Sequence, residues 1–178
     1  MSAKYILLVL VGVLILVLGY QFPIEPLPRA DYRISISAGV GVGLIIGFLY
    51  PRPLEWWTIS IFILLGLLNL PVFSGMNFGL EYLKGEQGAY VWGLLPATFA
   101  MRLLVQNGWD RSFLHILVSM FIGVTMVFLC GSFWVYAIHG LDRAFSWTIL
   151  IQVPTYFILG TGCALCVFVA KKLVSVRG

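Results

Sequence analysis

Long apolar stretches make up most of the chain, and short polar or proline-containing segments separate them. A helix that crosses a bilayer needs about 20 mostly apolar residues, and each stretch is close to that length or longer. The pattern therefore predicts an all-α integral membrane protein whose six transmembrane helices form a single transmembrane domain over residues 1–178. The expected helices cover about residues 5–22, 34–50, 56–73, 89–105, 113–138 and 145–170.

Two of these stretches carry further information. The first follows Lys4 and could be a signal peptide, but it lacks small-x-small cleavage residues after Gly19, so we interpret it as a retained helix. In the second, closely spaced glycines predict close contacts with neighbouring helices. These glycines are Gly39, Gly41, Gly43 and Gly47.

Composition supports a membrane protein and excludes a freely soluble enzyme. Hydrophobic residues are 61% of the chain and charged residues 10%, against about 45–50% and about 25% in soluble domains. The net charge of +4 comes from scattered residues, so we expect no nucleic-acid binding. The chain contains no GxxxxGK[ST] motif and therefore carries no ATPase motor of that type.

The distribution of lysine and arginine predicts the orientation. With the N-terminus in the cytoplasm, seven basic residues lie inside and four lie outside. We therefore expect a multi-pass protein of the cell inner (plasma) membrane with both termini cytoplasmic. The inner residues are Lys4, Arg52, Arg102, Arg111, Lys171, Lys172 and Arg177, and the outer ones are Arg29, Arg33, Lys84 and Arg143.

The sequence gives little indication of a catalytic site. No Ser/His/Asp set and no paired intramembrane acids can be assembled, and neither histidine has a neighbour at metal-ligand spacing. We expect no catalytic residue, metal or cofactor. Cys163 and Cys166 form a CxxC pattern, but it lies in the middle of an apolar helix, where small-residue packing is favoured over a redox enzyme.

Polar and aromatic residues gather at the expected outer ends of the last helices. Two outer loops, at residues 21–33 and 74–88, are longer than a turn requires, so this face could capture a solute or carry merely solvated connections. A pocket there would suit a small, partly apolar molecule, although an aromatic belt at the headgroup level is the alternative. The residues concerned are Asn77, Tyr90, Trp92, Gln152, Thr155 and Tyr156.

Several motifs resemble one known family. Segment 70–80 reads LPVFSGMNFGL, segment 85–90 reads GEQGAY, and segment 107–112 reads NGWDRS. In order and spacing, these segments are similar to the BioY family, the biotin-specific S-component of energy-coupling factor transporters. The resemblance implies a bundle of six helices that captures biotin from outside. It also implies partners: a coupling transmembrane protein and two ATPases that supply the energy.

The chain also departs from that pattern. Where the family's sixth helix has Gly, Asp and Lys, this chain has Thr155, Tyr156 and Leu159. The family's Ala-x-x-x-Ala docking pattern is absent, and the first helix offers only Gly12 and Gly19. Function without the ATPase module, as a self-oligomer, is therefore an alternative for the partners. A divergent membrane scaffold, or a subunit for another small solute, is the alternative for the function.

The resemblance and the residue types together suggest a binding site. Asn77 and Gln152 are expected to bind the ureido group of biotin, and Tyr90 and Trp92 to pack against its bicycle. Lys84 or Arg143, on the expected outer face, would meet the carboxylate, and Tyr156 would add a hydroxyl from the last helix.

Overall fold

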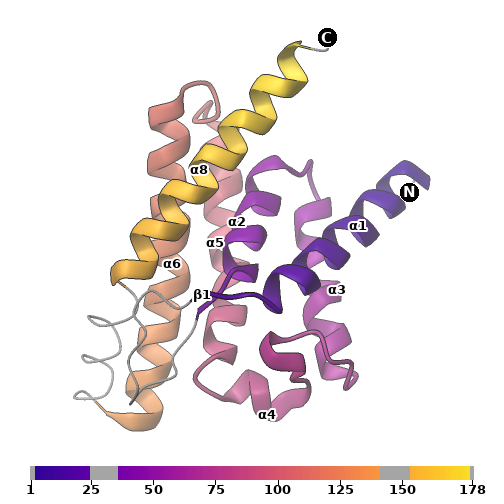
Figure 1. The fold of residues 1–178 in the computed structure, drawn as a ribbon, viewed down its shortest axis with the longest axis vertical. Coiled ribbons are helices and arrows are strands. Elements are labelled where there is room, and N and C mark those ends of the chain that lie inside the picture. Colours follow the sequence, from indigo (N-terminus) through magenta and orange to yellow (C-terminus); the bar gives the residue numbers. More distant parts are fainter. Residues whose placement is uncertain (1–2, 25–35, 141–152, 177–178) are drawn as a thin grey trace.

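The computed structural model describes residues 3–24, 36–140 and 153–176, and these form a bundle of helices (Figure 1). Two-residue strands β1 (Pro23–Ile24) and β2 (Ile36–Ser37) pair antiparallel beside it. The helices are α1 (Ala3–Tyr20), α2 (Gly39–Leu49), α3 (Leu54–Leu67), η1 (Ser74–Met76), α4 (Gly79–Lys84), α5 (Gly88–Gln106), α6 (Phe113–His139) and α8 (Val153–Val176).

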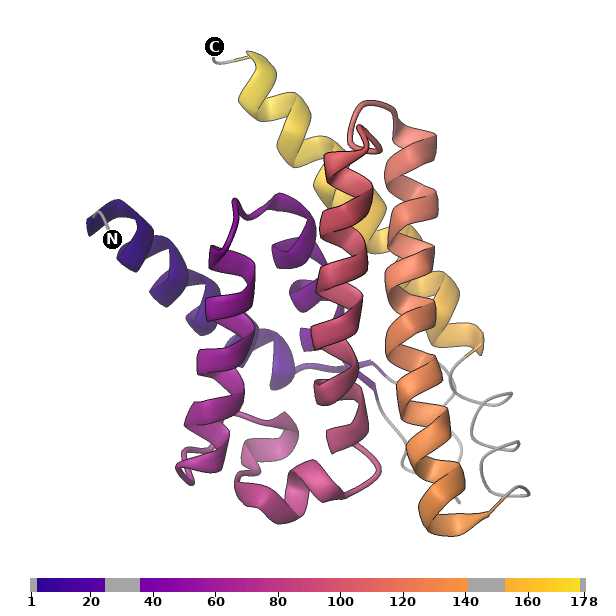
Figure 2. The ribbon, with the colours of Figure 1, turned by 180° about the vertical axis from the view of Figure 1, so that it is seen from behind.

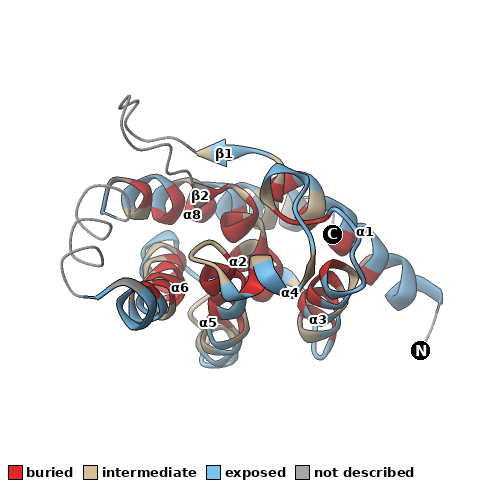
Figure 3. Cartoon of the chain, turned by 90° about the horizontal axis from the view of Figure 1, so that it is seen from below, coloured by how far each residue is buried: buried red, intermediate tan, exposed pale blue. Residues whose placement is uncertain are grey.

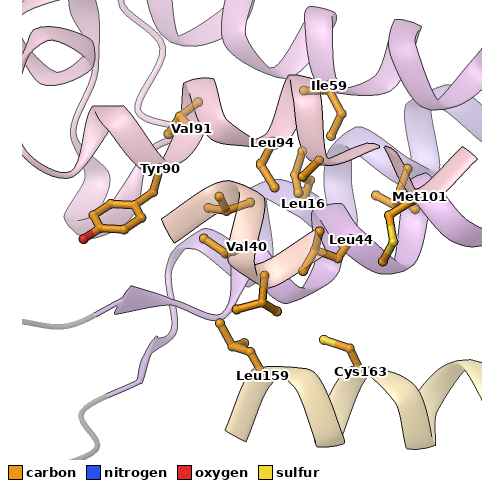
Figure 4. Close-up of a cluster of buried hydrophobic side chains, with 14 of the residues drawn as sticks. Leu16, Val40, Leu44, Ile59, Tyr90, Val91, Leu94, Met101, Leu159 and Cys163 are labelled. Atoms are coloured by element: carbon orange, nitrogen blue, oxygen red, sulfur yellow. The ribbon is translucent and has the colours of Figure 1, made fainter. Parts of the chain in front are cut away.

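Helix α2 is the centre of the bundle. It lies among α1, α5, α6 and α8 when the molecule is seen along the helices (Figure 3). Most of its residues are buried. Leu159 and Cys163 of α8 face Val40 and Leu44 of α2, as Figure 4 shows. Because α2 is short and enclosed by other helices, very little of its surface lies on the outside of the bundle.

The glycines of α2 make this central position possible. A Cβ on Gly39 would lie 2.0 Å from the Tyr20 ring of α1, and one on Gly41 would lie 2.9 Å from Cys163 Sγ of α8. Gly43 and Gly47 leave similar room for two side chains of α5. The predicted close contacts are confirmed, because at each of these glycines a neighbouring helix occupies the space that a side chain would fill.

The all-α prediction is confirmed, while three helices differ from their expected bounds by five or more residues. The last helix, α8, ends at Val176 instead of residue 170. The second helix begins at Gly39 instead of residue 34, and the third ends at Leu67 instead of residue 73. Within the described ranges, four helices (α1, α5, α6 and α8) are long and apolar enough to cross a membrane, and α2 and α3 are shorter apolar helices. Residues 145–152 of the expected sixth helix lie outside the described residues.

The outer surface of the bundle is apolar. Helix α1 buries one face, including Val13 and Leu16, and exposes Leu7, Leu10 and Leu14 on the other. A soluble protein would rarely expose such a continuous apolar face, whereas lipid is its natural surroundings. This surface is typical of a multi-pass membrane protein.

The two ends of the bundle are distinct (Figures 1 and 2). The C-terminal end of α8 lies at one end of the bundle, and the tilted helix α1 points toward the same end with its N-terminus; we call this the terminal end. Helix α4 lies at the opposite end, which we call the α4 end. The terminal end also carries the connection between α5 and α6, because Asp110 in that connection pairs with Lys171 of α8.

We expect replacement of Asp110 by asparagine to destabilise the protein slightly at neutral pH. The Lys171 Nζ atom lies 2.6 Å from Asp110 Oδ2, and this contact lowers the pKa of the Asp110 carboxyl. Because the pKa of Asp110 is lower in the folded protein than in the unfolded one, where it is about 3.9, the ion pair stabilises the fold above that pH. This contribution is lost as the pH falls through the folded pKa. Because both side chains are about one-third exposed, the loss should be at most about 1 kcal/mol.

Thermal unfolding in detergent at pH 7 and at pH 3 measures this effect. The difference between wild type and Asp110→Asn should shrink at pH 3. Glu81→Gln, an exposed carboxylate-to-amide change in α4, is the control and should leave the midpoint unchanged at pH 7. An equal effect of Asp110→Asn at both pH values would contradict the role of the ion pair.

Candidate functional site

Residues 68–78, between α3 and α4, form a tightly folded segment at the α4 end. The Phe73 N–H donates to the Asn77 carbonyl, and Asn77 Nδ2 donates to the Ser74 carbonyl at 2.7 Å. Gln21, just after α1, binds it from the side: Nε2 donates to the Phe73 carbonyl at 3.1 Å, and Oε1 accepts from Met76 N–H. Hydrogen bonds within the segment and from Gln21 therefore fix its shape.

Phe73 anchors this segment in the core. The side chain is fully buried and fills the space beside Gly66, where a Cβ would lie 2.0 Å from the ring. Its ring stacks on that of Tyr82 with centroids 4.8 Å apart and meets Phe62 edge to face. This stacking fixes α4 against α3.

Two tryptophans hold the other end of α4. Trp92 Nε1 of α5 donates to the Leu83 carbonyl at 3.2 Å, and Trp134 Nε1 of α6 donates to the Lys84 carbonyl at 2.9 Å. The last carbonyls of a helix have no partner within it, so the two indoles satisfy the C-terminus of α4. They also tie α4 to the two helices that follow.

A small polar cavity lies behind the 68–78 segment. Its volume open to a water-sized molecule is about 10 Å³, which is room for about one water. The Tyr20 hydroxyl is buried there and has no hydrogen-bond partner among the described residues. Burial raises the pKa of the Tyr82 hydroxyl to about 12. The lining residues are Tyr20, Ser37, Val40, Ser74, Tyr82, Gln87 and Tyr90.

A wider apolar groove lies between α6 and α8. It has a volume of about 430 Å³, within the range of small-molecule sites. The hydroxyls of Thr125 in α6 and Tyr156 in α8 are hydrogen-bonded at 3.1 Å and place polar atoms along one wall. The lining residues are Thr125, Phe128, Leu129, Ser132, Val153, Tyr156 and Phe157.

One aromatic pair separates the two spaces. Tyr90 lines the polar cavity and Phe128 lines the groove, and their rings meet edge to face with centroids 6.0 Å apart. The Phe128 and Tyr156 centroids lie 6.3 Å apart. Gly131 leaves room for the Tyr90 ring, because a Cβ there would lie 2.5 Å from it. The Tyr90–Phe128 pair therefore lies between the cavity and the groove.

The structure brings together only some of the expected site residues. Tyr90 and Tyr156 both line the described spaces. Asn77 is exposed and bonded within its own segment, and Lys84 is exposed at the end of α4. Trp92 supports α4 and lines neither space. Arg143 and Gln152 lie outside the described residues.

Sequence reasoning missed most of the polar lining. Tyr20 and Ser37 come from α1 and β2, far from the motif at residues 70–90. Thr125 and Ser132 lie inside the apolar stretch of α6, where they read as ordinary small polar residues. Gln87 stands within the GEQGAY segment, so the motif contained a signal for it.

Of the cysteine pair, Cys163 packs between helices as expected and Cys166 does not. Cys163 is buried against Gly41 of α2, and Cys166 is exposed. Both thiols are free. Among the described residues, no group of His, Cys, Asp or Glu side chains could hold a metal ion.

The comparisons with known proteins agree on one family. The model of the BioY family matches residues 1–177. The probable biotin transporter BioY of Pyrococcus horikoshii is 30% identical over 148 residues, which cover 82% of this chain and 82% of that protein. The probable biotin transporter BioY of Rickettsia prowazekii is 29% identical over 133 residues, 75% of this chain but only 64% of that protein.

A solved structure shares the fold. The crystal structure at 2.1 Å of the S-component for biotin from an ECF-type ABC transporter aligns with a TM-score of 0.79. The alignment covers 97% of this chain and 95% of that one, at 20% sequence identity. With its apolar helices and these relatives, the chain is a multi-pass membrane protein.

Proposed function

This chain belongs to the BioY family, and from that membership we propose that it is the membrane subunit that captures biotin for uptake. The observation that carries the proposal is the family match over residues 1–177. The relatives from Pyrococcus and Rickettsia, named as probable biotin transporters, support it. The protein is a transporter component and not an enzyme.

The membrane arrangement belongs to the same proposal. Residues 1–178 form one transmembrane domain that crosses the inner (plasma) membrane six times, with both termini in the cytoplasm. Two observations support this: the N-terminal end of α1 and the C-terminal end of α8 point in the same direction along the bundle (Figure 1), and most basic residues of the described ranges lie toward that end. Helices α2 and α3 can take part despite their lengths of about 16 and 21 Å, because neighbouring helices and the adjoining segments complete the crossing.

Biotin would bind at the α4 end, across the polar cavity and the α6–α8 groove. The polar cavity as it stands is too small for the vitamin, so binding requires Tyr90 to move and open it toward the groove. Tyr90 and Tyr156 would then flank the bicycle, and Gln87 would offer its amide to the ureido group.

The other expected residues have supporting places in this proposal. Asn77 would act by holding the Ser74 carbonyl and hence the shape of the cavity wall. Trp92 would keep α4 in position. Lys84, at the end of α4, remains a candidate for the biotin carboxylate, as do Arg143 for that group and Gln152 for the ureido group.

Energy for uptake would come from other chains. The sequence has no P-loop motif, so two separate ATPases and a coupling transmembrane protein would drive release of biotin to the cytoplasm. A self-oligomer without these subunits is the second arrangement. Co-purification of tagged protein from its native membrane distinguishes a complex with ATPases from a complex of identical chains.

Direct binding of biotin to the purified full chain tests the proposed function. We expect saturable binding to one site, measured by isothermal titration in detergent, and competition by unlabelled biotin in a radioligand assay. Because Tyr156 stands where the family has an acid, the alternative is a divergent membrane scaffold or a subunit for another small solute. Folded protein that binds no biotin would reject the proposal in favour of that alternative.

A further inference from the structure

A second cavity lies at the terminal end, away from the proposed biotin site. It has a volume of about 270 Å³ and lies where α2 and α5 end and α8 passes. Its walls combine apolar side chains with three charged ones. The lining residues are Phe48, Leu49, Tyr50, Pro51, Arg102, Val105, Asp110 and Lys171.

The charges of this cavity are not balanced. Lys171 Nζ contacts both the Asp110 carboxylate and the Asp110 carbonyl at 2.6 Å, so the acid is already paired. Arg102 Nε is inaccessible to water and has no hydrogen-bond partner among the described residues. The lining side chains thus carry one excess positive charge, and it belongs to Arg102.

A buried guanidinium nitrogen without a partner is costly. An arginine near the end of a transmembrane helix normally extends its head into water or the headgroup region. Arg102 lies only one turn before α5 ends at Gln106, yet its Nε atom is enclosed. The rest of the side chain lines the cavity and is only partly buried, so an anion in the cavity would neutralise the guanidinium charge.

We propose that this cavity binds the headgroup of an anionic phospholipid, with the phosphate on Arg102. A phosphodiester carries one negative charge, which matches the excess on the lining. Phe48, Leu49 and Val105 offer an apolar wall to the glycerol and the start of an acyl chain. The cavity lies where helices end, which is the depth of the headgroups, and basic pockets between helices at the cytoplasmic surface are typical lipid sites.

Free phosphate and a partner protein are the competing occupants. A free anion would not need the apolar wall. A partner's acidic side chain would need an opening toward the cytoplasm, whereas a lipid is present around the helices at all times. The combination of one unpaired cation with an apolar wall favours the lipid.

Native mass spectrometry of the purified full chain tests the proposal. Delipidated protein is titrated with phosphatidylglycerol and, separately, with phosphatidylcholine. Wild type should retain one phosphatidylglycerol molecule in preference to phosphatidylcholine, and Arg102→Gln should weaken that retention at least tenfold. Arg52→Gln is the matched control, because Arg52 is an exposed arginine between α2 and α3 and does not line the cavity.

A second variant blocks the cavity without removing the positive charge of Arg102. Val105→Trp fills the cavity while keeping Arg102, and it should also abolish retention of phosphatidylglycerol. Equal retention by wild type, Arg102→Gln and Val105→Trp would overturn the proposal. So would displacement of the lipid by inorganic phosphate at equal concentration. Loss of co-purification with a coupling subunit in Arg102→Gln, with lipid retention intact, would assign the cavity to a protein partner instead.

Discussion

Replacing Tyr90 by leucine is expected to lower the affinity for biotin at least about tenfold, which corresponds to about 1.4 kcal/mol. Tyr90 is 5% exposed and belongs to the wall of the polar cavity, and its ring meets Phe128 of the adjoining groove. Leucine removes the flat ring that would stack on the bicycle and the hydroxyl that faces the cavity. Isothermal titration of biotin into wild type and variant measures the loss.

Two further variants make this result specific. Tyr136→Leu is the same chemical change at a half-exposed position of α6, and it should leave biotin affinity unchanged. Tyr90→Phe keeps the ring and removes only the hydroxyl, so it should lose less affinity than Tyr90→Leu. A folded Tyr90→Leu protein with wild-type affinity would place the biotin site elsewhere.

Gly88→Ala is expected to destabilise the protein by about 3 kcal/mol, the upper end of the usual cost of overpacking. A Cβ on Gly88 would lie 2.3 Å from the Tyr82 carbonyl oxygen and 2.4 Å from Leu83 Cα. These are backbone atoms of α4 and cannot rotate away as a side chain can. Helix α4 would have to move, and both indole hydrogen bonds to its last carbonyls would be lost.

Thermal unfolding of the purified protein in detergent, followed by tryptophan fluorescence, measures this cost. Gly162→Ala is the matched control, because nothing lies within 4 Å of a Cβ at that position of α8. There, alanine should stabilise the helix by about 0.5–1 kcal/mol. If both substitutions had the same effect, the close approach of α4 and α5 would not be as the structure describes.

The pattern of apolar residues along the chain correctly predicted the long helices α5 and α6. The expected helix at residues 113–138 is α6 at Phe113–His139, and the one at 89–105 is α5 at Gly88–Gln106. Both are bounded by glycine or polar residues, so the end of the apolar stretch and the end of the helix coincide. The motif at residues 70–90 also directed attention to Tyr90, which lines the candidate site.

The same pattern was wrong at the end of α3. Leu68, Leu70, Val72 and Phe73 continue the apolar stretch, but α3 ends at Leu67 and Asn69 has a positive φ of 64°. Val72 and Phe73 are buried in the core, whereas Leu68 and Leu70 are exposed on the outside of the bundle. Hydropathy alone cannot distinguish a helix from a folded segment that carries the same apolar residues.

The sequence by itself determined that this chain is a helical membrane protein of the BioY family, since apolar length and motif spacing are local properties that are read along the chain. Only the tertiary structure decided which side chains meet. It paired the Trp92 and Trp134 indoles with α4 carbonyls 9 and 50 residues away, and it left Arg102 Nε enclosed without a partner. Such contacts depend on how helices distant in sequence pack around α2, and no local pattern encodes that geometry.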